Sequence, residues 1–302
     1  MNLKNNMEQE FLLQIKNQRQ SKEYLITSAM RLIIGDKNIQ MVETINATVT
    51  LLSYHNEKCI FHYKQTDYKR NSTNEDFFAL TSIINSLLEN FQIKCDKSGK
   101  IEQILITNEK AKGDEIYKYL LTKYQDRKNE VKELKSLIDD FISDKSKLVE
   151  QLNKSGFHRI LFNRHYGNKI IGKAIEEKKV IEKLVNGIDV PVVLEKIFEV
   201  DEKEKNYTLK INGVLDIENF DKKTLVRWLK NITDTYNLKV DCGVEIEDIF
   251  VFDEDHWLQE ADSYFSFLAA NLYECSYAYK VVQVKSTSIH ENKENTNKWI
   301  TK

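Results

Sequence analysis

Residues 91–109 read FQIKCDKSGKIEQILITNE, and residues 236–254 repeat the pattern as YNLKVDCGVEIEDIFVFDE. The two stretches align without a gap at a constant offset of 145, and the match extends back to residues 80 and 225. Six of the nineteen positions are identical, and most of the others keep their polarity. Because the same apolar positions must face a core in each copy, we expect both copies to form helix, strand, turn and strand with the same pairing.

The first copy belongs to a β-rich module at residues 21–110. Alternating apolar and polar residues predict three strands before it, at 22–34, 39–54 and 59–65. A polar run at 67–74 then separates them from a helix whose apolar residues, from Phe77 to Leu87, recur at three- and four-residue spacing. The repeated hairpin closes the module, with strands expected at 91–96 and 100–107.

A second β-rich module at residues 191–286 contains the other copy. It starts with a strand at 192–200, and the dipeptide Asn212-Gly213 predicts a tight turn between strands at 207–211 and 214–217. A helix around Trp228 and the hairpin at 236–252 follow. Two strands end the module, at 264–268 and 273–285, and the regular alternation of the last one predicts that it is well paired.

A helical insertion at residues 111–190 separates the modules. Apolar steps of three and four from Val131 to Leu152 predict a long amphipathic helix. We expect its apolar stripe to pack on a second helix at 170–185, with an intermolecular coiled coil as the alternative. With an N-terminal extension at 1–20 and a disordered tail at 287–302, the chain is predicted to be an α+β protein: two related antiparallel β-sheet modules (meander, helix, hairpin) bridged by an α-helical hairpin.

Composition and charge predict a cytoplasmic globular protein. The chain has 302 residues, of which 41% are hydrophobic and 30% charged, as in ordinary globular proteins. A net charge of -2 gives no attraction to nucleic acid or to an anionic membrane. The sequence contains no run of 18 apolar residues, so we expect no membrane insertion. The four cysteines are scattered without a C-x-x-C spacing, which argues against a zinc ribbon or a disulfide scaffold.

Motifs for catalysis are missing from the sequence. There is no glycine-rich phosphate loop, no G-x-S-x-G and no H-E-x-x-H, and the six histidines are dispersed. The run from Asp253 to His256, with Glu260 a turn later, offers possible ligands for a divalent ion. Neighbouring carboxylates in an extended chain point to opposite sides, so we favour a solvated turn. We therefore expect no catalysis, no cofactor and no metal.

The charges are segregated along the sequence. Segment 154–173 contains five cations and no acid, whereas segment 241–262 contains nine acids and no Lys or Arg. The first segment also concentrates aromatic residues, which suits an anion pocket or a docking surface; the alternative is a helix corner whose Arg side chains cover apolar surface. Single-sign clusters steer protein encounters. We therefore select seven candidate partner-binding residues: Arg159, Arg164, His165, Tyr166, Asp253, Asp255 and Trp257.

The first hairpin carries a resemblance to a group of proteins. Its pattern Phe-x-Ile-x-x-Asp-x-x-Gly-x-Ile-x-x-Ile, from Phe91 to Ile104, is followed by an aromatic-rich stretch at 116–119. This combination resembles uncharacterised Bacteroidetes-type proteins, some of them associated with type VI-like contractile secretion loci. The second copy departs from the pattern, with Val244 at the place of the glycine. The resemblance implies a protein partner, such as a secreted effector or a secretion-system component, and no catalytic residues.

Three functions remain open at this point. We expect a non-catalytic intracellular protein that binds another protein, as an adaptor, chaperone or immunity-like partner, and self-association is compatible with the opposite charges. The first alternative is a carrier that holds an apolar ligand in the cavity of a curved sheet. The second is a hydrolase whose site has no recognisable motif.

Overall fold

The computed structural model describes residues 9–15, 20–55, 58–74, 87–106, 109–154, 156–162, 165–234 and 238–284. Eleven strands form one sheet in which all neighbours are antiparallel. From one edge to the other they are β6 (Ile101–Ile106), β5 (Asn90–Cys95), β4 (Lys58–Ser72), β3 (Lys37–His55), β2 (Ser21–Ile34), β13 (Tyr273–Val284), β12 (Leu258–Ala269), β11 (Cys242–Phe252), β10 (Asn206–Leu215), β9 (Ile188–Asp201) and β8 (Ile175–Val185). The protein is therefore α+β, with most strands in a large antiparallel sheet.

The sheet is continuous through both predicted modules. β13 pairs with β2 from Tyr273 opposite Ile34 to Val284 opposite Glu23, so the last strand joins the first long one. The predicted last strand is thus paired on both sides, as its alternation indicated. Two short strands, β1 (Glu10–Leu13) and β7 (Gly167–Ile170), form a separate antiparallel pair.

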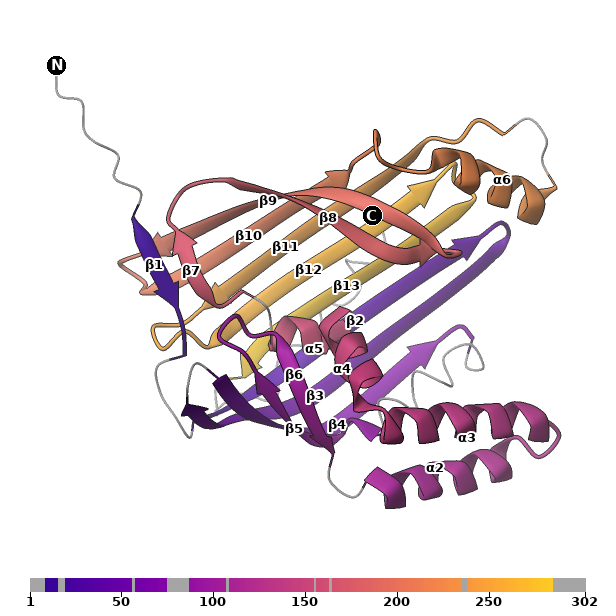
Figure 1. Cartoon of the computed structure of the whole chain (residues 1–302), viewed down its shortest axis with the longest axis horizontal. Helices are drawn as coiled ribbons and strands as arrows, with labels where there is room; N and C mark the ends of the chain where they lie inside the picture. Colours follow the sequence, from indigo (N-terminus) through magenta and orange to yellow (C-terminus); the bar gives the residue numbers. More distant parts are fainter. Residues whose placement is uncertain are drawn as a thin grey trace.

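One face of the sheet is concave and carries the core. Figure 1 shows both edges of the sheet coming forward, with α4 (Lys145–Lys154) and α5 (Gly156–Leu161) in front of the central strands. Tyr24 and Ile26 of β2 point to this concave face and are buried, as the alternation predicted. The opposite, convex face carries charged pairs, such as Lys280 with Glu260 and Asp262, and also exposed apolar residues such as Ile249 and Leu268. An antiparallel sheet with one covered and one wet face shows this alternation.

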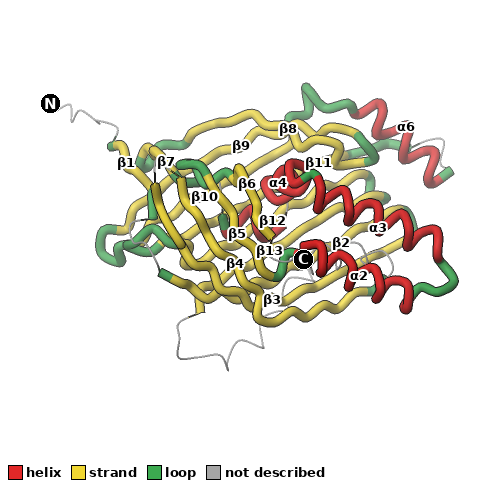
Figure 2. The backbone as a smooth tube through the Cα atoms, turned by 60° about the horizontal axis from the view of Figure 1, so that its bottom comes forward, coloured by secondary structure: helices red, strands yellow, loops and turns green. Residues whose placement is uncertain are grey.

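Three further helices lie around the sheet. α2 (Glu109–Lys123) and α3 (Lys128–Ser143) pack side by side around their own small core (Figure 2). Asp221 is the N-cap of α6 (Lys222–Thr233), and its carboxylate accepts a hydrogen bond from the amide of Thr224. Leu225 and Leu229 of this helix are buried in the main core. Among the described residues, no helix is both long and apolar enough to cross a bilayer.

The predicted helical hairpin differs from the observed helices. The apolar pattern from Val131 to Leu152 is divided at Asp144 into α3, which packs on α2, and α4, which packs on β6. The second helix predicted at 170–185 is wrong, because these residues form the end of β7 and the edge strand β8. Charged side chains cover most of β8. Such charges keep a sheet edge from pairing with strands of other chains. In the sequence, the same run of charges is also compatible with the polar face of a helix.

The repeated hairpin forms only in the first copy. β5 pairs with β6 there, but residues 238–241 of the second copy lie outside strands, and β11 pairs with β10 and β12. The matched side chains also face opposite ways: Ile104 is 6% exposed and Ile249 43%, whereas Leu105 is 59% exposed and Phe250 1%. A shift of one residue exchanges the two faces of a strand. The expectation of equal pairing in both copies is therefore wrong.

Two other boundaries also differ from the prediction. The polar run at 67–74 does not end the third strand, since β4 continues to Ser72. The turn predicted at Asn212-Gly213 is wrong, because both residues lie inside β10. Gly213 allows close packing of its neighbours there, because a Cβ atom at this position would lie 2.6 Å from Leu194 Cδ2 and 3.0 Å from Ile246 Cβ. Most of the helix predicted from Phe77, and the tail at 287–302, lie outside the described residues.

Gly213→Ala tests this close packing. We expect the added methyl group to lower the free energy of unfolding by about 1–3 kcal/mol, because it meets two side chains of the packed concave face. Gly243→Ala in β11 is the matched control, since nothing lies within 4 Å of its Cβ position. Urea unfolding followed by circular dichroism measures both. Equal stability of the two variants would contradict the assignment.

Candidate functional site

A row of mostly polar side chains crosses the concave face, which we call the polar belt. Residues directly opposite one another in neighbouring antiparallel strands share a face. Read from β9 to β4, the ladder places these residues in one row: Lys196, Ile211, Asp248, Ser263, Tyr279, Ser28, Glu43 and Arg70. Such a row through the interior of a fold requires partners for each charge.

Hydrogen bonds satisfy the two acids of the polar belt. Ser263 Oγ donates to Asp248 Oδ1 at 2.5 Å. Glu43 accepts from Ser28 Oγ at 3.2 Å and from the hydroxyl of Tyr68 at 2.6 Å. Both carboxylates are therefore held on the concave face by neighbouring strands.

Arg159 of α5 faces the polar belt. Its guanidinium lies 4.0 Å from Asp248 Oδ2, with side-chain exposures of 31% for Arg159 and 6% for Asp248. Burial raises the pKa of Asp248, and the positive charge of Arg159 opposes that rise. Burial also raises the pKa of Tyr279 to about 12, so its hydroxyl stays protonated at neutral pH. Neither Arg159 nor Tyr279 makes a hydrogen bond to a residue within the described ranges.

Further cations surround His165 at the same end of the belt. Burial lowers the pKa of His165 well below its usual range, and the charges of Arg159, Lys196, Lys169 and Lys179 lower it further. Lys196 pairs with Glu177. Lys169 Nζ donates to the carbonyl of Tyr166 at 3.3 Å, and burial together with Lys196 lowers its pKa to about 8. Positive charge therefore gathers where α5, β7, β8 and β9 meet.

An apolar row lies beside the polar belt, which we call the apolar strip. It consists of Ile246, Phe265, Tyr277 and Met30, directly opposite one another on β11, β12, β13 and β2. All four are half-buried, and the Phe265 and Tyr277 rings lie 6.3 Å apart. The next row toward α6 is buried and contains Val244, Phe267, Cys275 and Leu32. The apolar strip thus lies between the polar belt and a buried row of the concave face.

An aromatic cluster fills the other end of the concave face. The rings of Phe61, Tyr63, Phe91, Phe157, His158, Phe162 and Trp257 contact one another there. Within the described part of the chain, three buried atoms of this cluster have no hydrogen-bond partner: Tyr63 Oη, His158 Nε2 and Trp257 Nε1. Burial lowers the pKa of His158 to about 3, so its imidazole is neutral at physiological pH.

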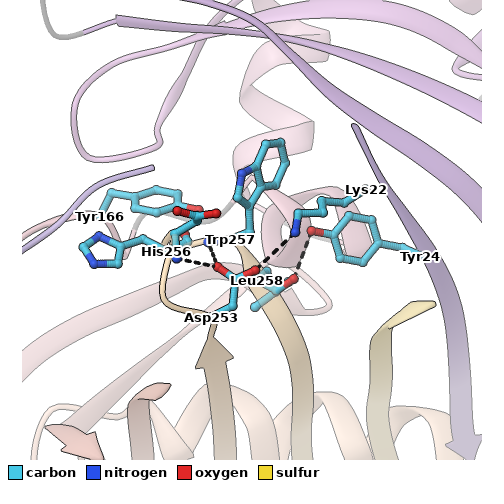
Figure 3. A network of polar contacts seen from close by, with 8 residues as sticks. Lys22, Tyr24, Tyr166, Asp253, His256, Trp257 and Leu258 are labelled. Carbon is cyan, nitrogen blue, oxygen red and sulfur yellow. Dashed lines mark hydrogen bonds and ion pairs between the residues drawn. The ribbon is translucent and has the colours of Figure 1, made fainter. Parts of the chain in front are cut away.

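The acidic turn between β11 and β12 has a structural role (Figure 3). Asp253 accepts hydrogen bonds from the amides of Asp255 at 3.0 Å and Trp257 at 2.9 Å, and its carboxylate lies 3.3 Å from Lys22 Nζ. The hydroxyl of Tyr166 donates to the carbonyl of His256 at 3.1 Å. No group of three or more metal-ligating side chains occurs among the residues that can be described.

The structure separates the seven selected residues. Arg159 and His165 lie in the cation-rich region beside the polar belt, whereas Asp253, Asp255 and Trp257 belong to the turn and Tyr166 contacts it. Arg164 lies outside the described residues. The acidic segment is also divided, because Glu245 and Glu247 are exposed while Asp248 points inward.

Sequence reasoning missed the apolar strip. The alternation of Tyr273, Cys275, Tyr277 and Tyr279 showed that they share a face. This alternation did not indicate that the side chains in the middle of the concave face stay partly exposed, because the helices that cover the rest of the face come from distant parts of the chain.

A charged groove of about 650 Å³ lies elsewhere, between α4 and the β5–β6 edge. Lys58 pairs with Glu102 at 2.8 Å and Lys154 with Glu150 at 2.6 Å along its walls. These four charges have partners within the chain, and we regard the concave face as the better candidate site.

Comparisons with known proteins do not assign the chain to a family. No protein-family model and no curated protein matches it. One solved structure that it resembles is DynF from the dynemicin biosynthesis pathway of Micromonospora chersina, at 6% identity over 93% of this chain and 88% of that one. The TM-score of 0.20 is too low to support an argument about fold or function.

The buried His158 predicts a specific dependence of stability on pH. Its pKa is about 3 in the folded protein and 6.5 in the unfolded chain, so its contribution to stability is complete above pH 6.5 and is lost as the pH falls toward 3. At pH 5 the loss amounts to about 2 kcal/mol.

His158→Phe keeps a ring in the cluster and removes the titration. We expect the variant to lose less stability than the wild type between pH 7 and pH 5, as measured by urea unfolding at both values. The same loss in both proteins would show that His158 does not titrate in this way.

Proposed function

We propose that the protein is a non-catalytic carrier that binds a small, largely apolar molecule on the concave face of its sheet. The observation that supports it is the apolar strip, whose four side chains stay partly exposed between the polar belt and a buried row. Apolar surface left open within a concavity, beside a few polar groups, is the usual composition of a ligand site.

The dimensions of the apolar strip favour a small ligand over a folded partner. Successive side chains on one face of a strand are about 7 Å apart, and four neighbouring strands span about 15 Å. An α-helix with its side chains is about 10–12 Å across, which is wider than this single row. A slender or planar molecule matches the strip better.

A protein-binding role is the second candidate. The observation that favours it is the edge strand β8, which is eleven residues long and exposes Ile175 and Val180. An exposed edge can pair with a strand of another protein. The many charges on β8 disfavour such pairing, so we rank the carrier first. A cytoplasmic location belongs to the proposal, and the four free cysteines are compatible with a reducing compartment.

Phe265→Ala tests the carrier with the neutral fluorescent probe Nile red. We expect saturable binding to the wild type and an affinity about tenfold lower in the variant, because a large part of the apolar contact is removed. Tyr264→Ala is the matched control, since Tyr264 is also half-buried and points to the convex face of the same strand. Fluorescence titration gives the affinities. Absence of saturable binding, or the same loss in both variants, would refute the carrier.

A further inference from the structure

The arrangement of donors beside the apolar strip indicates the chemical class of the ligand. Arg159 has five N–H donors, yet its one described polar contact is the 4.0 Å ion pair with Asp248. Charge-assisted hydrogen bonds between guanidinium and carboxylate are about 2.7–2.9 Å long. The Arg159 side chain is 31% exposed, and its donors make no hydrogen bond within the described chain. Donors that the chain leaves unused on a partly exposed side chain are available to a ligand.

Tyr279 provides a second unused donor at the same place. Arg159 lies near enough to influence the ionisation of both Asp248 and Tyr279. Tyr279 is next to Ser263 in the polar belt, and two residues earlier on β13 Tyr277 belongs to the apolar strip. Its hydroxyl stays protonated at neutral pH, so it can donate to an anion. The unused donors are therefore about one row, or 7 Å, from the apolar surface.

The charge balance of this region favours an added anion. Lys169 is a half-buried cation whose described hydrogen bond goes to a carbonyl oxygen and not to a carboxylate. Lys196 and Arg159 act on the same neighbour, His165. Asp248 and Glu177 offset the charges of Arg159 and Lys196, and Ser263 already donates to Asp248, so the unpaired positive charge among these described cations is that of Lys169. A further oxyanion would find a cationic and hydrogen-bonding environment that the chain itself leaves incomplete.

We infer that the ligand is an anionic amphiphile, whose carboxylate binds Arg159 and Tyr279 at the polar belt while its apolar body covers the apolar strip. This inference rests on the proposed carrier function and adds the charge and the orientation of the ligand. α5 and α6 lie near different ends of the central strands (Figure 1), so the carboxylate points toward α5 and the body toward α6.

Matched ligands separate the charge from the apolar body. Decanoate and decanol have the same chain, and calorimetric titration at fixed ionic strength and pH 7 compares their affinities. We expect decanoate to bind the wild type at least about tenfold more tightly than decanol, since charge-assisted hydrogen bonds are available only to the acid. In Arg159→Gln this preference should fall to near one, with decanol binding unchanged. Arg227→Gln, at an exposed position of α6, is the control and should keep the preference.

A double variant covers the folding risk of the single one. Arg159→Gln alone leaves the buried Asp248 without its cation, whereas Arg159→Gln with Asp248→Asn removes both charges of the pair. Loss of the preference in the double variant supports the inference. Equal affinity of the wild type for decanoate and decanol would overturn the anionic ligand and leave the carrier intact. A preference that survives both variants would overturn the placement of the carboxylate at Arg159. Failure of the wild type to bind either compound would overturn the carrier itself.

Discussion

The pairing between β2 and β13 is the interaction on which the rest of the structure depends. It joins the strands of the N-terminal half to those of the C-terminal half, from Tyr273 opposite Ile34 to Val284 opposite Glu23. Without this ladder the chain would have two smaller sheets, each with an additional unprotected edge. With it, one curved sheet has a single concave face, and side chains from both halves enter one core.

This continuous face explains why buried charge is tolerated in the interior. The polar belt runs through strands of both halves, so Asp248 from one half and Glu43 from the other lie in the same row. α5 contributes Arg159, which lies next to Asp248 on the concave face. Buried charges are retained where hydrogen bonds and counter-charges compensate their desolvation. Compensation is more complete around Glu43 than around Arg159, and this imbalance distinguishes the candidate site from ordinary core.

Local patterns predicted the elements well where one interaction dominates. Alternation identified the strands that became β2, β5, β9 and β13, and the spacing around Trp228 identified α6. The prediction was wrong where a pattern has two physical explanations. The charged residues of β8 suit a polar helix face as well as a protected sheet edge. Gly213 follows Asn212 as in a tight turn, yet it is a glycine because Leu194 and Ile246 lie where a Cβ atom would be.

The sequence by itself determined the α+β class, most strand positions and which residues of a strand share a face, because side chains alternate at a period of two along every strand. It also marked Arg159 and His165 as unusual. Only the tertiary structure decided which rows of the concave face are covered and which stay partly open. That depends on α5, α6 and the register between strands far apart in the chain, and register is set by cooperative packing and not by any local stretch. The same limit explains the repeat, whose two copies have similar residues but opposite faces toward the core.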